Sequence, residues 1–151
     1  MAPWTPDRSL LRTTRGLVLA TAAVLALGAC GSGGGSDADA PTADDLDGTT
    51  YTSTGVSGHD LVEGTAVTLS FEGDRMAAAA GCNNQAAAYE VEGATLRWSG
   101  EAASTRMACP EDLTAQDQWL AGLLTDGMTV ALDGSTLTLA SGDVEMVLEA
   151  D

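Results

Sequence analysis

Short stretches of alternating apolar and polar residues, separated by glycine turns, constrain the fold of this chain more than any other feature. Val67, Leu69 and Phe71 alternate with polar residues, and a Glu-Gly-Asp turn follows them. The pattern recurs in residues 89–91, 96–98, 128–132, 137–139 and 144–148. Alternation with a period of two indicates strands that bury one face, and glycine after aspartate favours hairpin turns. Short strands at this spacing predict an antiparallel sheet that closes, or nearly closes, on itself.

One segment follows helical spacing instead. Its periodic residues are Leu113, Gln116, Leu120, Leu123 and Leu124. Glu111 and Asp112 suit a helix start because the helix dipole favours anions there, and Pro110 suits the first turn. Asp126-Gly127 ends the pattern. The chain is therefore predicted to be mainly β, a small antiparallel β-barrel or rolled sheet with one α-helix over Asp112–Leu124.

Residues 1–29 have the organisation of a signal peptide. Three arginines precede an apolar stretch of twelve residues, Gly16 to Leu27. This stretch is too short to span a bilayer, which needs about 20 apolar residues. The following Leu27-Gly28-Ala29-Cys30 resembles the bacterial lipobox, in which the cysteine receives diacylglycerol and becomes the new N-terminus. An ordinary secretory signal with a chance cysteine is the alternative. The interpretation predicts an extracytoplasmic lipoprotein held at the bacterial cell membrane through Cys30.

Residues 30–45 are predicted to be a tether ahead of a domain at 46–151. Residues 31–45 read GSGGGSDADAPTADD and contain no aliphatic side chain larger than alanine, so they cannot bury a core. The glycines lack the strand, helix and lysine of a phosphate loop. The pairs Asp37/Asp39 and Asp45/Asp47 lack the terminal glutamate of a calcium loop.

The charge of the chain excludes one class of partner. Removal of residues 1–29 leaves three arginines, no lysine and 21 acidic residues, a formal net charge of −18. Such a charge repels nucleic acid, whose binding requires neutralisation of phosphates. It also opposes contact with anionic lipid, so a membrane association has to come from the lipid on Cys30.

Two cysteines remain after lipidation of Cys30, and a disulfide between Cys82 and Cys109 is the preferred interpretation in an oxidising compartment. Closing a loop of this length stabilises the fold by about 3–4 kcal/mol. The alternative is thiol chemistry assisted by His59, the only histidine, but no CxxC motif is present. Two cysteines and one histidine rarely form a closed zinc site. We therefore expect no metal site and no catalytic residue.

The residues around these cysteines resemble the META domain (HslJ-like) family. The resemblance rests on Gly81-Cys82-Asn83, Tyr89, Thr105-Arg106-Met107-Ala108-Cys109 and a helix with Asp117 before Trp119-Leu120, in that order. It implies a β-rich fold of lipocalin-like topology with one helix, often in exported lipoproteins linked to heat shock, antibiotic tolerance or motility, without a defined enzymatic reaction. It also assigns the family-motif positions Gly81, Asn83, Tyr89, Thr105, Met107, Ala108 and Asp117. Departures are Ala87 for a glycine, Asp117 for the usual Glu, and Tyr51 for an early tryptophan.

Several polar and aromatic residues near the motif are expected to have structural roles. Asn83 and Asn84 are expected to satisfy backbone groups in the turn beside the disulfide. Arg106 is expected to pair with an acidic neighbour, and both Trp98 and Trp119 are expected in the core. The alternative places Asn83, Thr105 and Arg106 along a surface groove.

These observations lead to one preferred function and two alternatives. The preferred one is a non-enzymatic, lipid-anchored envelope protein that binds an unknown envelope partner under stress and carries no cofactor besides its lipid. The first alternative is a lipocalin-like carrier, since alanines at 77–80 and 86–88 leave space inside a barrel unless the helix fills it. An enzyme is the second alternative, and the sequence offers no recognisable catalytic set for it.

Overall fold

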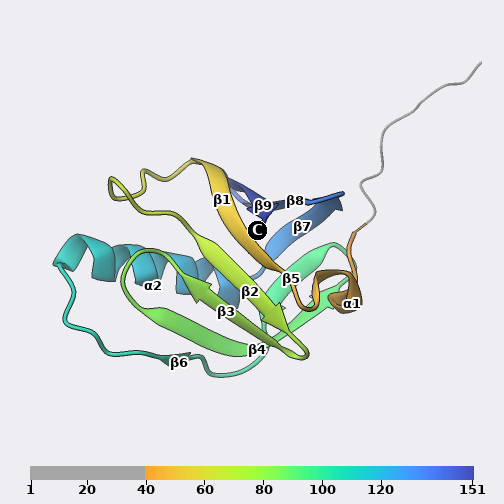
Figure 1. The fold of residues 1–151 in the computed structure, drawn as a ribbon, viewed down its shortest axis with the longest axis horizontal. Helices are drawn as coiled ribbons and strands as arrows, with labels where there is room; N and C mark the ends of the chain where they lie inside the picture. Colours follow the sequence, from red (N-terminus) through yellow and green to blue (C-terminus); the bar gives the residue numbers. More distant parts are fainter. Residues whose placement is uncertain (1–39) are drawn as a thin grey trace, which may run out of the picture. The chain divides into compact units, whose positions relative to one another are not determined.

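Two helices and nine strands follow one another in residues 40–151, the part of the chain that the computed structural model describes (Figure 1). In chain order they are α1 (Ala43–Leu46), β1 (Thr50–Ser57), β2 (Thr68–Glu72), β3 (Arg75–Ala79), β4 (Asn84–Glu92), β5 (Thr95–Trp98), β6 (Ala103–Ser104), α2 (Glu111–Asp126), β7 (Met128–Asp133), β8 (Thr136–Ser141) and β9 (Val144–Ala150). The predicted signal peptide, the predicted lipobox with Cys30, and residues 31–39 of the predicted tether lie outside the described residues.

The strands close into a barrel. The hydrogen-bonded order is β3-β2-β1-β9-β8-β7-β5-β4, and pairing of β3 with β4 completes a ring of eight strands. Every pairing is antiparallel, and the short β6 adds to β4 beside the ring. Gly134 and Gly142 turn the last two hairpins with φ of 60° and 59°, a region that other residues rarely adopt. The predicted antiparallel barrel with one long helix is confirmed.

The barrel interior and the inner face of α2 form one continuous apolar core. Burial alternates along the strands, as in β8, where Leu137 and Leu139 are both 0% exposed. Leu120 and Leu124 of α2 are equally buried and belong to the same cluster. The largest buried side chains are Leu46, Leu69, Phe71, Met76, Leu96, Leu120, Leu124, Met128, Leu137, Leu139, Met146 and Leu148. The helix therefore contributes to the interior, packing against β3 and β5.

The folded region begins earlier than the sequence predicted. Pro41 and Leu46 are buried, and the short helix α1 covers Ala43–Leu46. Hydrogen bonds from the Thr42 hydroxyl and backbone to the Asp45 carboxylate begin this helix and lower the pKa of Asp45. The tether prediction is therefore wrong for residues 40–45, because two apolar side chains and a local cap are enough to order them.

The boundaries of other elements also differ from the predicted ones. Helix α2 spans Glu111–Asp126, slightly more than the predicted Asp112–Leu124, and Pro110 precedes its first helical residue. The two-residue β6 was not expected, since it contains no apolar alternation. No helix in residues 40–151 is long and apolar enough to cross a membrane.

Candidate functional site

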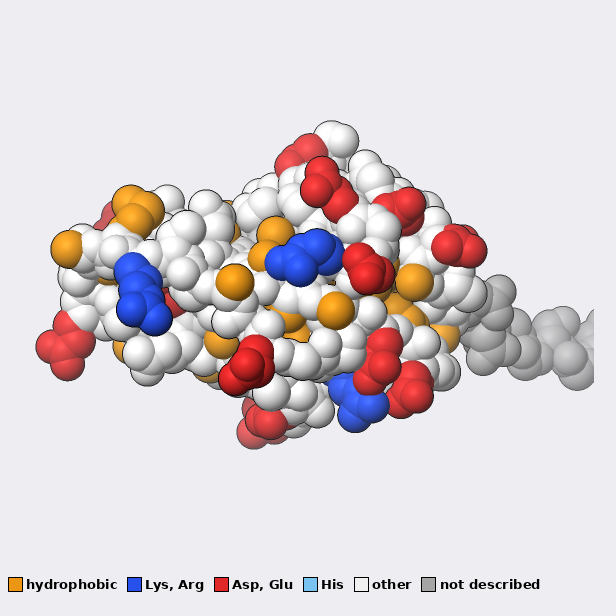
Figure 2. Space-filling view, turned by 90° about the horizontal axis from the view of Figure 1, so that it is seen from below, with side chains coloured by type: hydrophobic (Ala, Val, Ile, Leu, Met, Phe, Trp, Pro, Cys, Tyr) orange, Lys and Arg blue, Asp and Glu red, His pale blue; other side chains and the backbone are white. Residues whose placement is uncertain are grey.

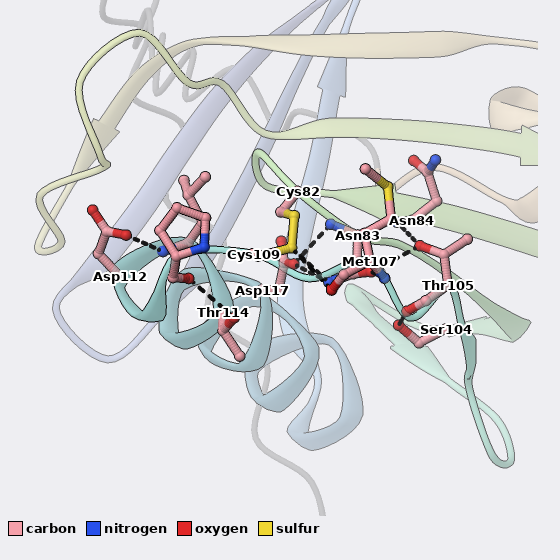
Figure 3. Close-up of a disulfide and its surroundings, with 12 residues drawn as sticks. Cys82, Asn83, Asn84, Ser104, Thr105, Met107, Cys109, Asp112, Thr114 and Asp117 are labelled. Carbon is pink, nitrogen blue, oxygen red and sulfur yellow. Dashed lines mark hydrogen bonds between the residues drawn. A yellow bond between two sulfur atoms is a disulfide. The ribbon is translucent and has the colours of Figure 1, made fainter.

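The disulfide joins two segments that the sequence separates by 27 positions. Cys82 lies in the turn between β3 and β4, and Cys109 lies just before α2 (Figure 3). Their Cα atoms are 6.3 Å apart, within the range that a disulfide spans. The bond between Cys82 and Cys109 is therefore as the sequence analysis expected. While it exists, neither sulfur is a free nucleophile.

Asn83 connects three segments around this bond. Its Oδ1 accepts hydrogen bonds from the Thr105 hydroxyl at 3.0 Å and from the Met107 backbone N–H at 2.9 Å. Its Nδ2 donates to Asp117 Oδ2 at 3.2 Å and to Cys109 Sγ at 3.2 Å, and its backbone N–H donates to the same Asp117 oxygen at 2.8 Å. Asn83 does satisfy a backbone group, but that group belongs to a distant segment and not to its own turn.

Asp117 is a buried carboxylate on the inner face of α2. Its residue is 4% exposed, and its Oδ2 accepts both hydrogen bonds from Asn83. Its Oδ1 is buried and has no hydrogen-bond partner within residues 40–151. The Asp117 backbone carbonyl accepts from Gln85 Nε2 at 2.8 Å, which ties the helix to β4. A carboxylate oxygen of Asp117 and both Sγ atoms lie within 4.8 Å of one another, a grouping of the kind that holds a metal.

Gln116 is a second buried polar residue on this face, and it occupies one of the periodic positions from which the helix was predicted. Its Nε2 donates to Thr65 Oγ1 at 2.9 Å and to the Ala80 carbonyl, and its Oε1 accepts from the Val62 backbone at 2.6 Å. The helix thereby holds the loop between β1 and β2. A glutamine at a core position of the helical period was the sequence signal for this contact.

The loop Thr105–Cys109 is anchored by hydrogen bonds to Asn83 and faces solvent. Met107 is 63% exposed and is the one large exposed hydrophobic residue in the described part of the chain. Arg106 and Ala108 are exposed beside it. The predicted ion pair of Arg106 is wrong, because within residues 40–151 only Arg97 pairs with carboxylates, those of Glu90 and Glu92. Arg97 faces Glu90 across β4 and β5.

The loop Thr105–Cys109 carries a cation, whereas the rest of the domain surface is mainly acidic. Figure 2 shows acidic side chains spread over one face of the molecule, with few positive ones among them. The described residues include three arginines, of which Arg97 is engaged as stated above. Arg106 is thus an exposed cation beside an exposed apolar side chain on a strongly acidic domain.

Two other family-motif residues have structural roles. Gly81 has φ of 130°, and a Cβ there would lie 2.8 Å from Thr65 Cγ2 and 3.2 Å from Leu113 Cδ2. Tyr89 lies in the core, its ring 5.1 Å from that of Phe71, and its hydroxyl donates to the Ala43 carbonyl at 3.2 Å. Burial raises the pKa of the Tyr89 phenol. Neither residue presents chemistry to solvent.

The single histidine makes an aromatic contact. His59 stacks on Trp119 with ring centroids 3.8 Å apart and an angle of 11° between the planes. Trp119 is only partly buried and packs against the outside of the core. Trp98 is buried, at 4% exposure, as expected. This corrects the expectation for Trp119, whose position on α2 faces the β1–β2 loop and not the barrel interior.

Comparisons with known proteins agree with this architecture. A family model described as the META domain matches residues 44–151. Two proteins with NMR structures share the fold. One is 23% identical, covers 72% of this chain and 94% of its own, and has a TM-score of 0.57. The other, from Burkholderia xenovorans, is 18% identical, covers 72% and 86% respectively, and has a TM-score of 0.57. None of the curated proteins matches significantly.

Proposed function

This chain belongs to the META domain family, and we propose that it is a non-enzymatic binding domain that presents the loop Thr105–Cys109 to a protein partner at the bacterial cell envelope. The observation that carries the proposal is that Met107 has a fixed backbone and an exposed side chain. Its backbone N–H is held by Asn83, while its side chain is 63% exposed. A side chain on a loop that is already ordered loses less entropy when a partner covers it.

The neighbouring charge suits the same use. Arg106 lies beside Met107, is exposed and has no ion-pair partner among residues 40–151. Arginine and methionine are both enriched in protein interfaces. A partner that offers a carboxylate next to an apolar pocket would complement the two side chains.

Attachment to the envelope is the second part of the proposal. Cleavage before Cys30 and lipidation of its thiol would place the domain outside the cytoplasm at the cell membrane, and the resemblance of residues 27–30 to a lipobox supports this. The negative charge of the domain keeps it off anionic lipid and makes nucleic acid an unsuitable partner. A contribution to stress or antibiotic tolerance would then act through the bound partner.

The small-ligand carrier is less well supported. The barrel interior and α2 share one core in which the large apolar side chains are fully buried, including Leu120 and Leu124 of the helix. The non-enzymatic assignment draws on two facts: both thiols are joined, and His59 stacks on Trp119. An outer surface is therefore the better candidate for binding.

A photo-crosslinking experiment in cells tests the binding proposal. A crosslinking amino acid replaces Met107 in the full chain, and a matched variant carries it at Glu145, which is exposed on β9. We expect a discrete crosslinked species from position 107 that is absent from position 145. Adding Arg106→Glu to the first variant should remove it. Identical crosslinks from both positions would refute the assignment of this loop.

Membrane attachment is tested separately. In Cys30→Ala, lipid attachment should be lost, leaving an uncleaved precursor or a mislocalised protein. Detergent partitioning of the variant as a processed lipoprotein would show that Cys30 is not the lipidation site. This result would leave the binding role of the loop untouched.

A further inference from the structure

We propose that Cys82, Cys109 and Asp117 form a zinc site when their disulfide is reduced. The two sulfurs and a carboxylate oxygen already lie within 4.8 Å of one another. From the sequence, His59 is the candidate third ligand, and two cysteines with one histidine predict no metal site. The fold supplies Asp117 instead, from the second turn of α2.

The three atoms are close enough for small shifts to bring them to zinc-binding distances. Zinc binds cysteine sulfur at about 2.3 Å and carboxylate oxygen at about 2.0–2.2 Å, so tetrahedral ligand atoms are roughly 3.3–3.8 Å apart. Breaking the S–S bond lets the two sulfurs separate toward that distance. The ligand set of two thiolates and one carboxylate leaves the fourth position for water.

The state of Asp117 points independently to a cation. The residue is 4% exposed, and its Oδ1 is buried without a hydrogen-bond partner in residues 40–151. A buried carboxylate oxygen without a donor is costly, and a bound cation would supply its missing partner. The Asp117 carboxylate thus keeps one oxygen free of hydrogen bonds while Oδ2 is held by Asn83.

The outer contacts of a metal site are also in place. Asn83 Nδ2 donates to both Asp117 Oδ2 and Cys109 Sγ, each at 3.2 Å. Donors of this kind orient the ligands of metal sites, and their loss typically costs roughly 10- to 100-fold in metal affinity. The same side chain would thus orient one carboxylate and one thiolate toward a shared ion.

The chemistry requires a reductant, which we name as a dithiol. The dithiol supplies two electrons and two protons, the Cys82–Cys109 S–S bond breaks, two S–H groups form, and the dithiol becomes a disulfide. Zn²⁺ then displaces both thiol protons to solvent as two Zn–S bonds form. Helix α2 keeps its position meanwhile, because Leu120, Leu124 and Gln116 hold it without the disulfide. The loop 105–109 would be fixed by a covalent bond in one state and by the metal in the other.

Zinc titration of the full chain tests the proposal. The chain carries Cys30→Ala, so that Cys82 and Cys109 are its only thiols, and calorimetry is run with a phosphine reductant that offers no thiolate. We expect one Zn²⁺ per reduced chain and no binding at that affinity by the oxidised chain. Asp117→Asn should bind at least about 10-fold more weakly, a loss typical of altered metal sites. Asp117→Glu, which keeps the carboxylate, should retain binding.

Matched controls separate this site from general acidity. Asp112→Asn removes an exposed carboxylate from the first turn of the same helix and should bind zinc like the parent chain. X-ray absorption of the zinc-loaded parent should show two sulfur ligands, a readout that does not depend on how any variant folds. Absence of zinc binding by the reduced chain, fewer than two sulfur ligands, or unchanged affinity in folded Asp117→Asn would overturn the proposal.

Discussion

The C-terminal strands β7–β9 and the disulfide junction, defined as residues 81–84, 105–109 and Asp117, are built on opposite principles. In β7–β9, partners are close in sequence: Asp133 pairs with Thr136 and Ser141 pairs with Val144 across single turns. In the junction, the hydrogen-bonded partners that join its three segments are 21 to 34 positions apart. The first region is held by a backbone ladder, and the second by side chains and one covalent bond.

This difference in sequence separation affects stability, because bringing together partners that are far apart in the chain costs more conformational entropy. A backbone ladder repeats the same bond at each residue, so one side chain matters little to it. The junction instead concentrates its contacts in Asn83, Asp117 and the disulfide. Substitutions should therefore have unequal effects in the two regions, and the junction includes the loop that exposes Met107.

The largest effect is expected from the disulfide. Cys82→Ser and Cys109→Ser should each lower the free energy of unfolding by about 2–4 kcal/mol, because the unfolded chain regains the entropy of an open loop. The double variant should be no worse than either single one, since all three lose one shared bond. Urea denaturation measures this, and hydrogen exchange should show β8 still protected. Additive losses, or two free thiols in a peptide map of the oxidised protein, would contradict it.

Glycine replacements give the next effect and compare the regions directly. Gly81→Ala should cost about 2–3 kcal/mol, because its φ is 130° and its Cβ would lie 2.8 Å from Thr65 Cγ2. Gly134→Ala, with φ of 60° and open space around it, should cost only about 1–2 kcal/mol from backbone strain. Thermal unfolding of the pair provides the measurement. Equal losses would mean that the contacts around Gly81 do not matter.

Removing the amide of Asn83 should have a smaller effect. Asn83→Ala deletes four side-chain hydrogen bonds but keeps the backbone bond to Asp117, and should cost about 1–3 kcal/mol. The control is Asn84→Ala, since Asn84 contacts Thr105 through its main chain. Exchange of the Met107 amide should speed up in the first variant alone. Matching stability and exchange in both variants would show that the Asn83 side chain does not hold the loop.

The smallest effect is expected in β8. Thr136 Oγ1 donates to Glu149 Oε1 at 2.8 Å in a partly buried position. Thr136→Val removes this bond but keeps the β-branched shape, so the loss should be about 0.5–1 kcal/mol. Denaturant midpoints of this variant and Asn83→Ala test the order. A larger loss at Thr136 than at Asn83 would reverse the comparison between the regions.

Much of the barrel could be predicted from local sequence, because alternation and glycine turns act between neighbours. The strands containing Leu69, Leu139 and Leu148 are where the alternation placed them, and α2 begins within a residue of its expected start. Elements without such a pattern were not predicted. Helix α1 depends on the burial of Pro41 and Leu46, which is a tertiary contact. Strand β6 has only two residues, too few to show a period. The predicted ion pair of Arg106 was wrong because an ion pair depends on which side chains the fold brings close to the arginine.

For the site, the sequence by itself determined which residues were available, and the tertiary structure decided what they contact. The three cysteines, one of them assigned to the predicted lipobox, were sufficient to predict the disulfide, because the two that remain can form only one pair. That Asp117 and Gln116 are buried, that Asn83 binds the Met107 backbone, and that Met107 is left exposed followed only from the closed barrel. The reason is that burial and hydrogen bonding depend on segments 22 or more residues away, which no local period encodes.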